Sequence, residues 1–323
     1  FDVERVDYGA SGSWKTDLLR TAWRRFQGGA SAPHHEELED WIGRPEQGSW
    51  LEDWALFIAL KHHFDGQPWP DWPADLRSRE SASLAAASQE LGEEIDYHRF
   101  VQYLFAVQWS RLREAAEGCQ VELLGDMPFY VAHDSADVWA RRHLFKVTAE
   151  GQPICIAGVP PDYFSETGQR WGNPVFSWNR HQEDGYRWWT QRVAHSLNLY
   201  HRVRIDHFRA FSTYWEIEAA QPTAAHGHWE PGPGVDLFER LWDALGELPL
   251  VAEDLGHITP EVRELRRQVG LPGMRVLQFG FDSHDSEHLP HNYPRDIVAY
   301  TGTHDNDTAV GWLEKLSPDR RQS

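Results

Sequence analysis

The spacing of apolar residues divides the chain into two parts. In the first part apolar side chains recur at helical intervals, which predicts amphipathic helices over residues 13–27, 50–64 and 97–117. The segments SAPHHEE and QPWPDWPADL lie between these helices and contain helix-breaking prolines, so we predict loops there. The front section is therefore predicted to be mainly helical.

Beyond residue 118 short apolar runs alternate with helical segments. Such runs predict buried strands, and a regular alternation of strand and helix is typical of α/β folds with a parallel sheet. We predict strands at about residues 121–125, 202–206, 249–253, 275–281 and 297–302, and helices at about residues 184–199, 235–245 and 259–269.

An acidic residue stands at the end of four apolar runs. These residues are Asp126, Asp206, Glu253 and Asp305. An unpaired carboxylate inside a buried strand would cost several kcal/mol or lose its charge, whereas one at the strand's end escapes that penalty. Acids at the carboxyl ends of successive parallel strands are typical of the active site of a barrel enzyme. The alternative for each single acid is a helix N-cap or an arginine partner.

One long segment interrupts the alternation of strands and helices. Residues 146–180 are rich in glycine, proline, asparagine and aromatic side chains. Loops of this length in compact domains are usually lids, binding loops or disordered segments. This loop carries Trp171 and Trp178, and a flat indole face suits the apolar face of a sugar ring. We therefore predict a lid that covers a substrate.

Composition excludes several classes of partner. The chain has 323 residues and a formal net charge of −19, from 50 acidic and 31 basic residues. Such an acidic chain disfavours nucleic acid and anionic membranes, and no apolar run approaches the ~18 residues of a membrane span. We predict a cytoplasmic protein whose two cysteines, Cys119 and Cys155, are reduced thiols.

The histidine pairs do not predict a metal site. His34–His35 and His62–His63 are adjacent in sequence, whereas metal ligands on one helix are typically four residues apart. We therefore expect no metal.

The acids suit the cleavage of a glycosidic bond. In retaining glycosidases one carboxylate attacks the anomeric carbon and a second carboxyl group protonates the departing oxygen, about 5 to 5.5 Å away. We predict Asp206 as the nucleophile, because Arg204 should keep its pKa low and its carboxylate ionised. Glu253 is then the acid/base, and Asp254 should point away from it if the strand continues.

His304 and Asp305 form the third part of the predicted site. Asp305 can bind ring hydroxyls and favour distortion toward the transition state, while His304 can donate a hydrogen bond. The alternative for His304 is a structural histidine.

Seven segments of the sequence match one known family. They are GDMPFYVAHDSADVW, GVPPDYFSETGQRWGNP, RVRIDHFRAF, AEDLGHITPEV, LPGMRVLQFGF, LPHNY and YTGTHDNDTAVGW. With them the chain resembles the 4-α-glucanotransferases, or amylomaltases, of glycoside hydrolase family 77 in the α-amylase clan.

The resemblance implies an α/β fold, a (β/α)8 TIM-type barrel with helical insertions. Residues 1–117 would be mainly a helical insertion and the start of the catalytic domain, and residues 118–323 the barrel core with the catalytic acids and the lid. Relative to the family, the chain is expected to lack the first barrel strand or strands and the last one, so that its barrel is incomplete.

The resemblance also implies a mechanism and partners. An α-1,4-glucan donor would form a glycosyl enzyme on Asp206, without metal or organic cofactor. The 4-hydroxyl of glucose or of a maltodextrin, deprotonated by Glu253, would accept the glycosyl group. The family's third acid falls on Asp305, its paired histidine on His304 and its arginine on Arg204.

Further residues are implied to contact sugar. Asp126 and His207 should line the central subsite, and the long loop contributes Asp162, Phe164, Gln169, Trp171 and Asn173.

Two other functions stay open at this point. One is an α-glucan hydrolase of the same clan, with water as the acceptor. The other is a non-catalytic glucan-binding protein on a degenerate barrel, against which the intact acids argue. The sequence does not indicate the oligomeric state.

Overall fold

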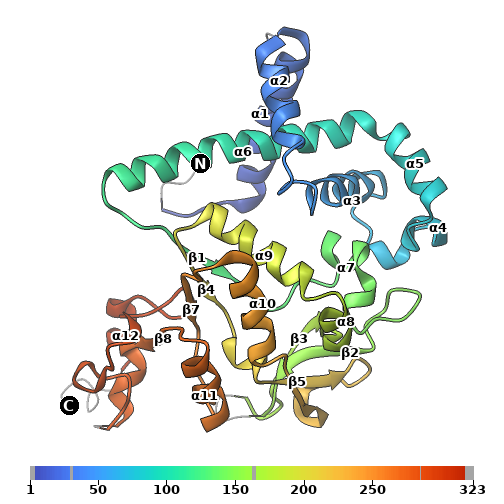
Figure 1. Ribbon diagram of the computed structural model, residues 1–323. Helices are drawn as coiled ribbons and strands as arrows, with labels where there is room; N and C mark the ends of the chain where they lie inside the picture. Colours follow the sequence, from blue (N-terminus) through green and yellow to red (C-terminus); the bar gives the residue numbers. More distant parts are fainter. Residues whose placement is uncertain (1–3, 30–31, 162–164, 284, 317–323) are drawn as a thin grey trace. The chain divides into compact units, whose positions relative to one another are not determined.

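The computed structural model describes residues 4–29, 32–161, 165–283 and 285–316 (Figure 1). Two compact units make up the chain. Unit 1 contains residues 1–121, 131–155 and 172–177, and unit 2 contains residues 122–130, 156–171 and 178–323.

Unit 1 is mainly helical. Its helices are α1 (Tyr8–Gly29), α2 (Ala32–Ile42), α3 (Leu51–His63), α4 (Ala74–Arg77), α5 (Ser81–Glu90), α6 (Gly92–Gly118) and α7 (Ala136–Ala140), with 3-10 turns at Trp69–Asp71 and Arg142–Leu144. Helices α1, α2 and α6 pack through a core of Trp23, Leu38, Tyr97 and Phe100. The three predicted helices are confirmed, although Leu18 of α1 and Leu112 of α6 belong to the apolar stripes and are exposed.

The loops predicted in unit 1 are partly wrong. Helix α2 covers SAPHHEE from Ala32 onward, and QPWPDWPADL contains a 3-10 turn and the start of α4. Pro33 is the second residue of α2, and Pro70 also lies in the first positions of its turn. Proline is tolerated there because the first N–H groups of a helix have no partner within it.

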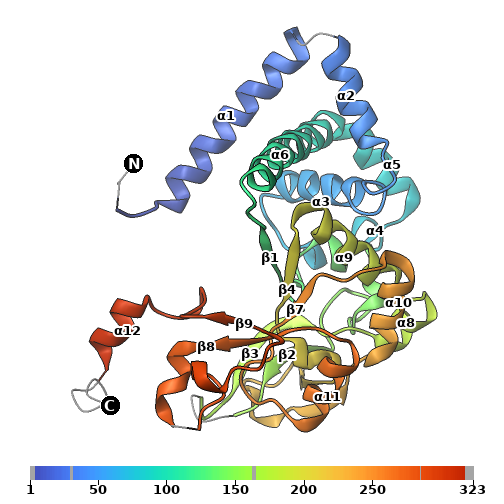
Figure 2. The ribbon, with the colours of Figure 1, turned by 60° about the vertical axis from the view of Figure 1, so that its left-hand side comes forward.

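Parallel strands form the centre of unit 2. Strands β1 (Leu124–Met127), β4 (Arg202–Ile205) and β7 (Leu250–Ala252) pair in the order β1-β4-β7, and β8 (Gly273–Val276) pairs with β9 (Ile297–Tyr300) (Figure 2). The Ala252 N–H donates to the Pro272 carbonyl at 2.8 Å and joins β7 to the start of β8. All of β7 is buried, as are Val203 and Ile205 of β4, as expected for parallel strands that are covered on both faces.

Helices and turns connect these strands. They are α8 (Trp178–Glu183), α9 (Arg187–Leu199), α10 (Val235–Leu245), α11 (Pro260–Gln268) and α12 (Ala309–Lys315), with 3-10 turns at Phe208–Phe211, Ala224–His226, Leu277–Asp282 and Pro290–Asn292. Helix α9 packs on β1 and β4. The predicted strand at 275–281 is mostly wrong, because β8 ends at Val276 and a 3-10 helix follows.

The segment 146–180 has more regular structure than the sequence predicts. It contains β2 (Cys155–Val159) and β3 (Gln169–Pro174), which join β5 (Thr213–Glu218) and β6 (His228–Pro231) in a sheet of order β3-β2-β5-β6. The sequence prediction missed this sheet.

Two predictions from composition can be compared with the structure. Over the described residues, no helix combines the length and the apolar character that crossing a membrane requires. Cys119 is exposed, Cys155 is buried, and neither forms a disulfide bond.

Candidate active site

An arginine links two of the predicted acids at neighbouring strand ends. Asp126 lies opposite Arg204 in the register of β1 and β4, and Asp206 directly follows β4. The buried Arg204 guanidinium donates to Asp126 Oδ1 at 2.6 Å and pairs with Asp206 Oδ1 at 2.9 Å. The two acidic side chains are 41 % and 43 % exposed, so a ligand can reach them.

The pKa of Asp206 differs from the sequence prediction. Burial raises the pKa of this carboxyl group above its ordinary value, Arg204 lowers it only in part, and the charge of Asp126 raises it further. The prediction of a lowered pKa is therefore wrong. The direct ion pair still favours the carboxylate form, which a nucleophile requires.

Glu253 follows β7 and is held by backbone groups. Its Oε2 accepts the His207 N–H at 2.8 Å and its Oε1 accepts the Leu255 N–H at 3.0 Å. Burial, and then the charge of Asp206, raise the pKa of Glu253 to about 7, although Arg204 and the two N–H groups oppose the shift. A carboxyl group that exchanges its proton near neutral pH suits general acid/base catalysis.

His207 connects the acids with an aromatic group. Its backbone is left-handed, with φ of 51°, directly after Asp206. Its ring lies 5.0 Å from the Trp171 ring and 6.4 Å from the Tyr130 ring. Burial, with a smaller effect of Arg209, lowers the pKa of His207 to about 3, so the imidazole is neutral at pH 7.

Tyr130 neighbours the candidate site residues, and the sequence prediction did not include it. Its ring is 6.2 Å from Trp171, which is exposed, so the two aromatic rings and His207 form one group in unit 2. The available signal was the position of Tyr130 four residues after Asp126, in GDMPFY.

His304 and Asp305 lie on the other side of Asp126. The His304 Nε2 atom is 3.9 Å from Asp126 Oδ2 and 3.5 Å from Asp305 Oδ1. Both side chains are more than half exposed. Contacts therefore run from Glu253 through His207 and Asp206 to Arg204, Asp126, His304 and Asp305.

The predicted lid residues have different outcomes. The Gln169 side chain accepts the Trp171 indole N–H at 3.1 Å, so it belongs to the same group. Asn173 lies in unit 1 and donates to the Val131 carbonyl at 2.8 Å. Asp162 and Phe164 lie outside the described residues.

Asp254 points away from Glu253, as predicted. Its buried carboxylate accepts the Met274 N–H at 2.7 Å and lies 3.3 Å from the Arg266 guanidinium and 3.6 Å from that of Arg275. It ties β7 to β8 and leaves Glu253 as the member of the pair that neighbours Asp206.

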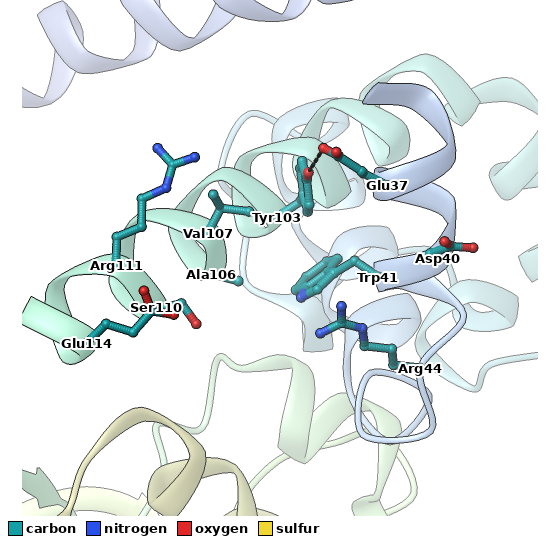
Figure 3. Close-up of a pocket in the computed structure, with 10 residues that line it drawn as sticks. All are labelled: Glu37, Asp40, Trp41, Arg44, Tyr103, Ala106, Val107, Ser110, Arg111 and Glu114. Atoms are coloured by element: carbon teal, nitrogen blue, oxygen red, sulfur yellow. Dashed lines mark hydrogen bonds between the residues drawn. The ribbon is translucent and has the colours of Figure 1, made fainter. Parts of the chain in front are cut away.

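A surface pocket of unit 1 contains none of the predicted site residues. It has a volume of about 490 Å³, and Figure 3 shows Trp41 and Tyr103 on one of its sides, with Tyr103 bonded to Glu37. Its other lining residues are Asp40, Arg44, Ala106, Val107, Ser110, Arg111 and Glu114.

Comparisons with known proteins agree on one family. A family model described as 4-alpha-glucanotransferase matches residues 1–323. A curated 4-alpha-glucanotransferase of Thermus thermophilus is 49 % identical over 99 % of this chain and 64 % of its own length. One from Synechocystis is 44 % identical over 100 % of this chain and 64 % of its own length.

A solved structure has the same fold. An amylomaltase from Streptococcus agalactiae, in complex with acarbose, matches with a TM-score of 0.93 and 39 % identity over 98 % of this chain and 64 % of that chain. The chain thus spans slightly less than two thirds of the length of each of these three relatives.

Proposed function

The chain belongs to the 4-alpha-glucanotransferase family, and we propose that the protein moves α-1,4-glucan segments from a donor maltodextrin to glucose or another glucan. The observation that carries this proposal is the pair formed by Asp206, held by Arg204 at 2.9 Å, and Glu253, with a pKa of about 7. A fixed carboxylate beside a carboxyl group that titrates near neutral pH is what a retaining double displacement needs.

In the first step Asp206 attacks the anomeric carbon of the donor. The glycosidic bond breaks, its electrons go to the leaving oxygen, and Glu253 gives that oxygen its proton. The products are a glycosyl ester on Asp206 and a shortened glucan, which leaves. Glu253 is then a carboxylate, ready to act as a base.

In the second step an acceptor sugar regenerates the enzyme. Glu253 removes the proton of the acceptor's 4-hydroxyl, whose oxygen attacks the anomeric carbon and releases the Asp206 carboxylate. Two inversions retain the α configuration. Neither step needs a metal or an organic cofactor.

The surrounding residues would bind the sugars. Asp126 and Asp305 offer carboxylate acceptors for ring hydroxyls, and His304 offers a donor between them. The exposed Trp171 ring, supported by Tyr130 and His207, offers a stacking surface for the acceptor. A stacked sugar that excludes water favours transfer over hydrolysis.

For the whole protein we propose a fold with more strands than the described sheet contains. The order β1-β4-β7 and the link from β7 to β8 support a (β/α)8 barrel, in which the acids lie at the carboxyl rim. We also propose a cytoplasmic location, which subcellular fractionation would test.

The products from maltotriose distinguish transfer from hydrolysis. Incubation with the full-length protein should give glucose together with maltodextrins longer than maltotriose, because a second sugar takes the glycosyl group. Chromatography of the products over time measures this. Glucose and maltose without any longer chain would instead support the hydrolase.

The pH dependence should follow the proton of Glu253. Glu253 must be protonated to assist the departing oxygen, and its pKa is about 7. We therefore expect kcat/KM for the donor to fall about tenfold per pH unit above this pKa. In a Glu253→Gln protein kcat/KM should no longer fall above this pH. If the same fall persisted in that variant, the titrating group would be another residue.

A further inference from the structure

Three side chains of unit 1 converge on one point, far along the sequence from the catalytic acids. His62 lies in the last turn of α3, and Glu94 and His98 lie on α6 four residues apart, which places them on one helix face. The structure assigns to His62, Glu94 and His98 a binding site for a divalent transition metal, of which Zn²⁺ is the best fit.

The distances suit a small metal ion. Glu94 Oε1 lies 2.8 Å from His62 Nδ1 and 3.1 Å from His98 Nε2, and the three potential ligand atoms all lie within 4.8 Å of one another. Ligands at about 2.1 Å from a tetrahedral zinc ion are about 3.4 Å apart. Small side-chain rotations therefore suffice to place an ion between them.

The ligand set has the right chemistry. Two imidazoles and one carboxylate are a known zinc set, with water in the fourth position. Water can reach this site because the His62 side chain is 55 % exposed, whereas that of His98 is only 9 % exposed and is fixed by packing. The ion would join α3 to α6, two helices already packed together (Figure 2).

One cation competes for the carboxylate. Arg20 of α1 donates to Glu94 Oε1, the same oxygen that both histidines contact. When an ion takes this oxygen, Arg20 keeps a second partner, because its guanidinium lies 3.5 Å over the Tyr97 ring. The charge of Glu93 also raises the pKa of Arg20, and Lys61 forms an ion pair with Asp134 at 2.7 Å.

Calorimetry with Zn²⁺ tests the site without relying on activity. The full-length protein, free of any histidine tag and treated with a chelator, should bind one equivalent saturably. His62→Gln and Glu94→Gln should each weaken binding at least about 100-fold, because each removes a direct ligand. His62→Gln is the main variant, since an exposed side chain can be replaced without loss of the fold.

His63→Gln is the matched control among the 18 histidines of the chain. It replaces the exposed neighbour of His62 and should bind Zn²⁺ like wild type. Zn²⁺ should also raise the melting temperature of wild type and of His63→Gln, but not of His62→Gln. Equal isotherms for wild type and His62→Gln, or no saturable equivalent in wild type, would overturn the site and leave the three residues as a hydrogen-bonded cluster around Arg20.

Discussion

Replacing Asp206 by asparagine should lower turnover of maltotriose by at least roughly 10⁴-fold. The amide has nearly the same shape but is a very weak nucleophile, so the glycosyl ester cannot form. The fold should persist, because Arg204 keeps its 2.6 Å bond to Asp126. Glucose release measures turnover, and thermal melting followed by circular dichroism measures stability.

An exposed aspartate of the same unit provides the control. Asp243 is exposed in the last turn of α10, a helix that carries none of the predicted acids, and Asp243→Asn should retain wild-type turnover. If Asp206→Asn also kept wild-type turnover, the site would not be catalytic. The glucan-binding alternative would then explain the intact acids.

The sequence predicted the positions of Asp206 and Glu253 at strand ends because their signal is local. An apolar run followed by an acid marks the end of β4 before Asp206 and the end of β7 before Glu253, and neither needs knowledge of distant residues. Alternation along a continued strand also predicted that Asp254 turns away from Glu253; the two residues do have different partners, although β7 already ends at Ala252.

Features that depend on distant residues were missed. Strand β5 pairs with β6 through Tyr214 opposite Glu230, and no short-range pattern specifies that register. Tyr130 and Trp171 meet only because the chain returns after about 40 residues. The wrong sign for the pKa of Asp206 has the same origin, because the adjacent Arg204 is visible in sequence but burial is not.

The metal-ligand cluster illustrates the same limit. Glu94 and His98 have the spacing that lets two residues of one helix bind the same metal ion, but His62 comes from another helix. In the sequence His62 stands next to His63, a pair that argues against a metal. Only the packing of α3 on α6 reveals which of the two histidines faces Glu94.

Replacing Glu253 by glutamine should separate the two steps of the reaction. With maltotriose as donor the loss should be about 10²- to 10⁴-fold, because the departing oxygen receives no proton. With α-maltosyl fluoride the first step should recover, since fluoride leaves without protonation. The glycosyl ester on Asp206 should then accumulate, because no base activates the acceptor, and mass spectrometry of the intact protein detects it.

Azide supplies the complementary measurement. Azide needs no deprotonation, so it should attack the accumulated ester of the Glu253→Gln protein and give an α-glycosyl azide. The wild-type protein should form this azide far more slowly than its ordinary transfer products. The recovered first step also shows that the introduced amide, facing the His207 and Leu255 N–H groups, has not disrupted the site. Adding Asp206→Asn should abolish the adduct. An equal loss with the fluoride and with maltotriose would mean that Glu253 does not act as the acid, and the catalytic proton would have to come from another group.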